Sequence, residues 1–329
     1  MELLGYAQPC VAHAGETVEV KASTTQPAVT AEVVRLGLAQ APAVPPAGGE
    51  FPGRRQDLVG GSYLIAAVPA IEGGHGLQFW FWPTLLGERQ TLVAGFAADG
   101  GWEVAAGEDG RLSVGRLSAA GEVLTSMSAG PVLRERRWYF AAASWHSSGL
   151  VTLAVAARNA PAGMNGEGPY DLGPPGAPAT LVAIGAAVPR GRPLRPFNGK
   201  IDTPRLFAGE LGATARQALA ADAPADRIGG LRHEWRFEPA ATLPPHRVRD
   251  HGPGRCDGTL VNLPTLGVAG RNWTPGTESF AAAPQEYQAA HFHADDLGDA
   301  GWATDLSFEV PSAWPSGVYG IRLRAGDHE

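Results

Sequence analysis

The chain is poor in the residues that would build several common classes of protein. Its two cysteines, Cys10 and Cys256, are too few and too scattered for a disulfide framework or a zinc site. Lysine occurs only as Lys21 and Lys200, and the net charge of −7 argues against a nucleic-acid partner. No apolar run is long enough to span a membrane, and the N-terminus lacks the pattern of a signal peptide. These absences predict a cytoplasmic protein that binds neither nucleic acid nor membrane.

Glycine and proline, in contrast, are abundant. The 44 glycines and 28 prolines suit many short strands joined by turns, and 329 residues allow two domains. Short β-rich runs recur at residues 62–68, 77–82, 90–96, 102–106, 111–117, 138–145, 150–155, 179–184 and 200–207. Asp109-Gly110 predicts a hairpin turn, a long loop is expected at 159–178, and a short helix at 213–221. The middle of the chain therefore predicts a two-sheet all-β domain of jelly-roll size.

The two ends of the chain each predict part of a second sandwich. Residues 15–23 alternate apolar and polar side chains, and residues 31–37 are β-rich. Residues 308–324 read as strand, turn and strand. Tyr319 precedes the inward-facing Ile321 by two residues, which is the spacing of the tyrosine corner of immunoglobulin domains. Each end has too few strands to form a sandwich alone.

We therefore expect the two ends to combine, with the middle of the chain inserted between them. Insertion requires only that the two ends of the host loop lie close together. The predicted fold is all-β, an immunoglobulin-like sandwich split by an inserted jelly-roll sandwich. The split sandwich comprises residues 1–55 and 285–329, the insert comprises 56–284, and the Pro/Ala/Gly-rich residues 40–52 form a connector.

Residues 287–305 hold the group of side chains most suggestive of chemistry. In a strand, His291 and His293 share one face and could bind one divalent cation, with carboxylates of the next turn completing the ligand set. The candidate ligands are His291, His293, Asp295, Asp296 and Asp299. The carboxylates also suit a turn that bonds to backbone amides, where the insert returns to its host. The segment is thus a metal site or a structural joint, and a joint would bury Trp302.

Trp80 and Trp82 are candidates for a sugar-stacking surface. The run Phe79-Trp80-Phe81-Trp82 places both tryptophans on one face of a strand and both phenylalanines on the other. One of these faces must belong to the core, so at least half of these aromatic side chains are structural.

The sequence gives little support for a site of nucleophilic catalysis. Gly60-Gly-Ser62 lacks the last glycine of a nucleophile elbow, and His75, among glycines, is expected in a loop. Neither cysteine has a local basic partner that would stabilise a thiolate.

Four segments carry a resemblance to known families. Residues 197–207, followed by a short helix, resemble the closing strand of laminin-G/concanavalin A-like lectin domains, and residues 250–260 resemble a segment common in that superfamily. Residues 258–273 and 291–302 resemble the large subunit of N,N-dimethylformamidase and its relatives. The order of parts is also similar, and the resemblance covers essentially the whole chain. It implies that the insert is a concanavalin A/laminin-G-like domain.

The resemblance further implies an iron-dependent amidohydrolase. In that family a tyrosine and two glutamates bind the iron, in a catalytic domain that follows the two β domains. Glu329 comes soon after the last predicted strand, so we assign no catalytic, iron-binding or other cofactor-binding residue to this chain, and expect the N-terminal half of such a subunit. The expected function is a non-catalytic scaffold for assembly and active-site framing, without activity of its own.

The expected partners are its own catalytic domain, other subunits or a second copy of the chain. Two alternatives stay open. One is a lectin-like module that binds carbohydrate, and the other is a metal-dependent hydrolase that uses residues 291–299.

Overall fold

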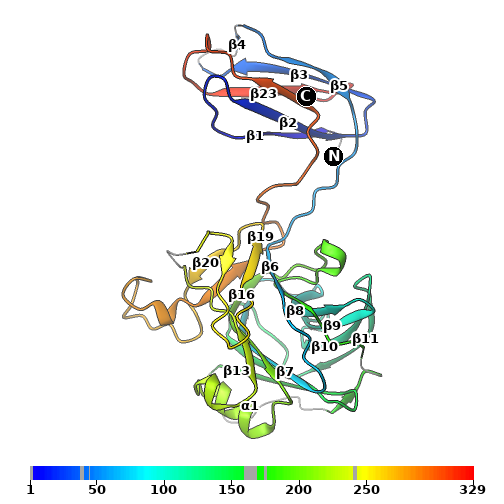
Figure 1. Ribbon diagram of the computed structural model, residues 1–329, viewed down its shortest axis with the longest axis vertical. Coiled ribbons are helices and arrows are strands. Elements are labelled where there is room, and N and C mark those ends of the chain that lie inside the picture. Colours follow the sequence, from blue (N-terminus) through cyan, green and yellow to red (C-terminus); the bar gives the residue numbers. More distant parts are fainter. Residues whose placement is uncertain (1–2, 38–40, 44, 159–168, 174–175, 240–242) are drawn as a thin grey trace. The chain divides into compact units, whose positions relative to one another are not determined.

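The computed structural model describes residues 3–37, 41–43, 45–158, 169–173, 176–239 and 243–329 (Figure 1). The chain divides into two compact units. We call residues 59–298 the central unit and residues 1–58 with 299–329 the end unit. The predicted return at residue 285 is wrong, because Ala289–Phe292 forms a strand of the central unit. The central unit therefore extends to residue 298.

Two eight-stranded sheets make up the central unit. The strands of the first are β6 (Tyr63–Ala67), β8 (Gln90–Ala97), β9 (Gly100–Ala106), β10 (Leu112–Ser118), β11 (Val123–Ala129), β15 (Leu181–Ile184), β18 (Arg247–Val248) and β19 (Gly258–Val261). The strands of the second are β7 (His75–Pro83), β12 (Tyr139–Trp145), β13 (Leu150–Ala157), β14 (Tyr170–Asp171), β16 (Gly199–Ala208), β17 (Leu231–Glu234), β20 (Thr265–Val268) and β21 (Ala289–Phe292). The first has the order β11-β10-β9-β8-β15-β6-β19-β18, and the second β14-β13-β12-β7-β16-β21-β20 with β17 beside β16. The predicted two-sheet architecture is confirmed.

Every strand predicted between residues 62 and 207 is present, with small shifts at the ends. The predicted helix is α1 (Ala213–Ala220), and three 3-10 turns are η1 (Pro189–Gly191), η2 (Ala225–Arg227) and η3 (Pro284–Glu286). Gly110 takes the positive φ of +71° that the Asp109-Gly110 turn requires. The expected long loop contains β14, while residues 159–168 and 174–175 lie outside the described residues.

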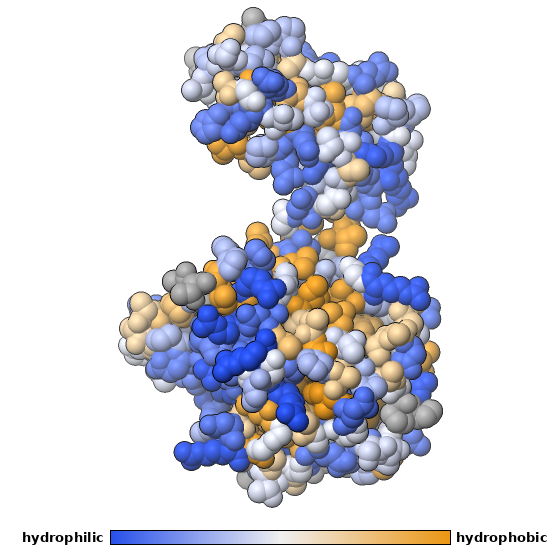
Figure 2. Space-filling view, viewed as in Figure 1, coloured by the Kyte–Doolittle hydropathy of each residue, from blue (hydrophilic) through white to orange (hydrophobic). Residues whose placement is uncertain are grey.

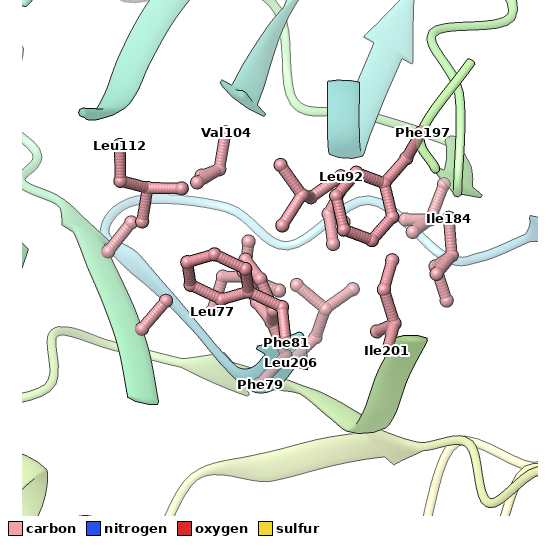
Figure 3. Packing of buried hydrophobic residues seen from close by; sticks show 14 of the residues in the cluster. Leu77, Phe79, Phe81, Leu92, Val104, Leu112, Ile184, Phe197, Ile201 and Leu206 are labelled. Atoms are coloured by element: carbon pink, nitrogen blue, oxygen red, sulfur yellow. The ribbon is translucent and has the colours of Figure 1, made fainter. Parts of the chain in front are cut away.

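The core of the central unit lies between its two sheets. Phe79 and Phe81 point inward from β7 and are fully buried. Figure 3 shows them converging with leucine, valine and isoleucine side chains of both sheets. Burying each such side chain contributes about 1.5–3 kcal/mol. The opposite face of the second sheet is also partly covered, because Leu219 of α1 packs with Phe207 and Trp80 in a smaller cluster.

The end unit is a sandwich of two small sheets. Strands β1 (Leu3–Gln8), β2 (Thr17–Thr24) and β22 (Leu306–Glu309) form the first, in the order β1-β2-β22. Strands β3 (Ala28–Arg35), β4 (Ala41–Pro42), β5 (Gly48–Pro52) and β23 (Tyr319–Arg324) form the second, in the order β23-β3-β4 with β5 beside β3. Strands from both ends of the chain therefore share each sheet (Figure 1).

One expectation for the end unit is wrong. Residues 48–52 are not a connector, because β5 pairs with β3 and inserts Phe51 into the core. The high glycine and proline content of this stretch is not typical of a strand, so the sequence did not predict one. Gly48 is required at its start, since a Cβ there would lie 2.1 Å from the carbonyl oxygen of Ala31.

The tyrosine corner is confirmed. The Tyr319 hydroxyl donates a hydrogen bond of 2.8 Å to the carbonyl oxygen of Pro315, and Ile321 packs against the core. Trp302 is also buried as expected, and its indole N–H donates to the carbonyl oxygen of Asp57 at 2.8 Å. None of the helices in the described part of the chain has the length and apolar character needed to cross a membrane.

Candidate functional site

A row of aromatic and basic side chains lies on the outer face of the second sheet. Cross-strand register places Lys200 of β16 between Trp82 of β7 and His291 of β21. Their neighbours Ile201 and Phe292 face the core, so these three side chains face outward. The Lys200 ammonium lies 4.7 Å from the Trp82 ring centroid, and the ring of His291 meets Trp82 edge-on at 6.3 Å. We call Trp82, Lys200, His291 and His293 the outer row.

Burial lowers the basicity of two side chains of the outer row, His291 and Lys200. The rings of His291 and His293 lie 4.0 Å apart. Burial, and then the nearby charges of His293 and Lys200, lower the pKa of His291 to about 4, so its imidazole is neutral at neutral pH. Burial also lowers the pKa of Lys200. The Nε2 of His291 is buried, with no hydrogen-bond partner among the described residues. A neutral imidazole is the form that binds metals, so this geometry leaves the metal hypothesis open.

The predicted metal ligands are only partly brought together. The Nδ1 of His293 lies 3.2 Å from Oδ2 of Asp296, while Asp295 is exposed in the adjoining turn. Asp299 belongs to the end unit, where its Oδ1 accepts hydrogen bonds from the Tyr6 hydroxyl at 2.6 Å and the Gly301 backbone at 2.9 Å. The carboxylate of Asp299 is thus used in the structure of its own unit.

The backbone of this segment holds the two ends of the central unit together. The amides of Gly61 and Ser62 donate to the carbonyl oxygens of Asp296 and His293 at 2.9 and 3.0 Å. In return, the His293 amide donates to Oγ of the fully buried Ser62 at 3.1 Å. The chain therefore enters and leaves the central unit side by side, which is the geometry that an inserted domain requires.

We expect Ser62→Ala to lower the stability of the central unit by about 1–3 kcal/mol, because the partly buried His293 amide loses its acceptor. His291→Ala and Asp296→Ala should retain this backbone pairing. A chelator should leave the melting temperature of the unmodified chain unchanged. Calorimetry of all four proteins with and without chelator checks this. A chelator-dependent shift in the unmodified chain that is absent from His291→Ala and Asp296→Ala would make the segment a metal site.

Of the two tryptophans proposed to stack on sugars, Trp80 is buried. Only 3% of its surface is exposed, and guanidinium groups of Arg158 and Arg271 lie 5.5 and 5.8 Å from its ring. The prediction of a sugar platform at Trp80 is therefore wrong, because other side chains cover its faces. Trp82 is partly exposed, with the Lys200 ammonium over its ring.

Sequence reasoning missed an aromatic cavity in the central unit. The cavity has a volume of about 440 Å³, and Trp102, Trp145 and His75 line it. His75 stacks on Trp145 at 4.7 Å, and burial lowers its pKa to about 4. His75 was expected in a loop, but it begins β7. Its alternation with Leu77 and Phe79 was the available sign of a strand.

Each buried carboxylate of the described residues is enclosed by donors. Glu103 lies between Arg89 and Arg195, at 2.7 and 3.1 Å. Glu234 contacts both Arg205, at 2.9 Å, and Arg236. These two glutamates are neutralised by arginine and do not fit an iron ion. They are therefore not the iron-binding glutamates that the resemblance implies.

Asp202 and Asp250 are the other two buried carboxylates. Asp202 bonds to Arg271 at 2.9 Å. Asp250 accepts from His233 at 2.7 Å and from three backbone amides. Among the described residues, His233, Asp250 and Cys256 form the one group of three or more potential metal ligands whose donor atoms all lie within 4.8 Å of one another. Burial and then the charges of Asp250 and Asp257 raise the pKa of the Cys256 thiol, so it is a poor ligand or nucleophile.

Comparisons with known proteins agree with this architecture. Residues 60–215 match the concanavalin A-like lectin/glucanases superfamily, and residues 265–329 match the family N,N-dimethylformamidase beta subunit-like, C-terminal. The N,N-dimethylformamidase beta subunit of Paracoccus aminophilus is 27% identical over 100% of this chain and 48% of its own length. That of an Alcaligenes species is 26% identical over 99% of this chain and 48% of its own. The chain thus spans about half the length of the curated relatives it matches.

Solved structures resemble the fold only weakly. A putative carbohydrate binding protein from Bacteroides ovatus is 13% identical over 79% of this chain and 91% of its own, with a TM-score of 0.40. A SAP-like pentraxin from Limulus polyphemus is 13% identical over 60% and 84%, with a TM-score of 0.38. Likeness of this degree carries no argument about binding. The similarity to the beta subunits, in contrast, extends along the whole sequence: the chain is similar over its full length to N,N-dimethylformamidase beta subunits and contains a concanavalin A-like domain.

Proposed function

We propose that this chain is the non-catalytic β scaffold of an N,N-dimethylformamidase-like amidohydrolase subunit. The observation that carries the proposal is its similarity to two beta subunits along its whole length, while it covers about half of theirs. In this proposal the catalytic groups and the iron belong to the other half of the subunit. The scaffold supports assembly and frames access to that active site, and its partners are the rest of the subunit and other subunits.

The buried polar groups support a structural role. A general base at neutral pH needs a carboxylate or imidazole whose pKa lies near the working pH. Burial would raise the pKa values of Glu234 and Asp250, but they are instead lowered, by arginine charges and hydrogen bonds at Glu234 and by hydrogen bonds from His233 and backbone amides at Asp250. His75 and His291 have pKa values near 4, too low for efficient proton abstraction at neutral pH. These groups therefore suit a rigid framework better than a hydrolytic site.

The central unit is built to be a stable insert. Its two ends are bound to each other through Ser62 and His293, so the scaffold holds together where the chain enters and leaves it. The two other functions considered for the chain lose support. The buried Trp80 cannot stack on a sugar, and Asp299 is engaged in the end unit.

The purified chain should not hydrolyse N,N-dimethylformamide or formamide above the rate in buffer. The physical reason is that its titratable buried groups are paired or held at unsuitable pKa values. Release of amine or ammonia and of formate, measured with and without added iron, checks this. The His75→Ala and His291→Ala variants are the controls. Turnover that disappears in either variant would show that the chain has its own active site.

A further inference from the structure

The end unit follows the immunoglobulin strand pattern up to strand F, which precedes the last strand, G, of that fold. The tyrosine corner at the start of β23 identifies it as strand F, and β22 before it as strand E. Strand β3 lies beside β23, as C lies beside F, and β2 lies beside β22, as B lies beside E. In such a sandwich the other edge of F pairs with strand G. Within the described residues, β3 is the only strand that pairs with β23.

The last residues of the chain make the turn that leads into such a strand. Ala325 and His328 exchange two backbone hydrogen bonds, of 3.0 and 3.1 Å, around Gly326 and Asp327. Gly326 has a φ of +58°, as two-residue hairpins require. Glu329 then contacts side chains of β23, Arg322 at 2.8 Å and Arg324 at 3.0 Å. The chain has therefore reversed its direction and runs back along β23.

The core beside this edge is open. A cavity of about 830 Å³ lies within the end unit, and Val20, Val33, Ile321 and Leu323 are among its lining residues. Ile321 and Leu323 point inward but are only partly buried, and apolar residues of this unit reach its surface (Figure 2). An added strand would place every second side chain over this space. Such an unpaired edge is also the usual template for strand addition.

The side chains of β23 define the chemistry of the strand that fits. Its inward positions meet Ile321 and Leu323, so they need apolar side chains. Its outward positions lie opposite Arg322 and Arg324, which already pair with the acidic side chain of Glu329, Arg322 also with Glu32. The fitting segment is therefore extended, antiparallel to β23, and alternates apolar with acidic or neutral polar residues.

We infer that the free edge of β23 takes one further strand, in the position of strand G, supplied by the part of the subunit that continues from Glu329. The chain spans about half of its curated relatives, so such a subunit has ample sequence for it. The strand joins the end unit to the rest of the subunit through main-chain hydrogen bonds. This inference goes beyond the proposed scaffold function, because it concerns how the sandwich is completed and does not depend on amidase activity.

The test compares three proteins. One is the chain ending at Glu329. The second adds about six residues, one strand length, with valine at inward and threonine or glutamate at outward positions. The third adds the same residues shifted by one position, which turns the valines outward. Hydrogen exchange of the Ile321 and Leu323 amides is measured, because they alternate with Arg322 and share the side on which Ala325 pairs. The melting temperature of the end unit is the second readout.

The in-register extension should slow exchange at Ile321 and Leu323 by about tenfold or more and raise the melting temperature. The shifted extension should do neither. Equal exchange in all three proteins would overturn the inference. So would an unextended chain that elutes as a dimer with these amides already protected, because a second copy would then occupy the edge. Neither outcome bears on whether the subunit is an amidohydrolase.

Discussion

Replacing Asp202 by alanine should lower the free energy of unfolding of the central unit by about 3–5 kcal/mol, because it leaves the largely buried Arg271 guanidinium without its buried carboxylate partner. Asp202 is fully buried on β16. Its Oδ1 accepts hydrogen bonds from the Arg271 guanidinium at 2.9 Å and the Thr203 hydroxyl at 2.6 Å, and its Oδ2 accepts from the Arg271 amide at 2.9 Å. Urea denaturation of the two proteins measures the difference.

Asp222→Ala provides a matched control on the same arginine. Its Oδ1 accepts from Nε of Arg271 at 2.8 Å, but its side chain is 39% exposed. Water can replace such a partner, so we expect a loss of about 1 kcal/mol or less. Comparable losses in the two variants would contradict the view that burial makes the Asp202 pair the critical one.

This pair also explains part of the stretch that carries the family resemblance. A Cβ on Gly270 would lie 2.6 Å from Oδ2 of Asp202, so glycine is needed for the Arg271 amide to reach that carboxylate. The presence of glycine followed by arginine at positions 270 and 271 is therefore explained by a structural contact within this chain.

The second large loss of stability is expected for Asp250→Ala. The Asp250 carboxylate is fully buried and accepts from Nδ1 of His233 at 2.7 Å. It also accepts from the backbone amides of Glu234, Gly252 and Cys256, each at 2.8 Å. Alanine would leave these donors unpaired, at a cost on the order of 3 kcal/mol or more. Asp250→Asn keeps one acceptor oxygen and should cost less. Equal losses for Ala and Asn would show that side-chain volume, and not hydrogen bonding, sets the cost.

The contribution of the Asp250 carboxylate to the stability of the fold should depend on pH. Burial alone would raise its pKa, but the hydrogen bonds from His233 and the three amides outweigh burial and lower it. A carboxyl group with a lowered folded-state pKa stabilises the fold above its unfolded pKa of about 3.9 and loses that effect as the pH falls through the folded value. The difference in the free energy of unfolding between the unmodified chain and Asp250→Asn should thus become smaller below about pH 4. A difference that stays constant into strong acid would contradict this account.

Much of the fold follows from local patterns in the sequence. Alternation and turn residues predicted nine strands between residues 62 and 207, but not β11 or β14, together with the helix α1 and the tyrosine corner of Tyr319. Strand β5 was missed because glycine and proline dominate its composition. The return to the end unit was placed too early because the alternation of β21 shows a strand but not its partner, which is β16.

The sites were harder to predict because their partners are distant in sequence. The pairing of Asp202 with Arg271 depends on a tertiary contact that spacing does not show. Alternation correctly placed Trp80 and Trp82 on one face of β7, but it could not show that α1 and its neighbours cover that face only near Trp80. His291 and His293 were correctly placed together, whereas their backbone pairing with residues 61 and 62 was not foreseen.

Turnover of N,N-dimethylformamide by three proteins tests the scaffold account most directly. The first is this chain, and the second is the half of the Paracoccus aminophilus beta subunit that this chain does not match. The third joins that half to this chain, and each is supplied with the other subunits of that enzyme. The account predicts no turnover by this chain and more turnover by the joined protein than by the half alone. Turnover by this chain without the other half, or equal turnover with and without it, would contradict the account.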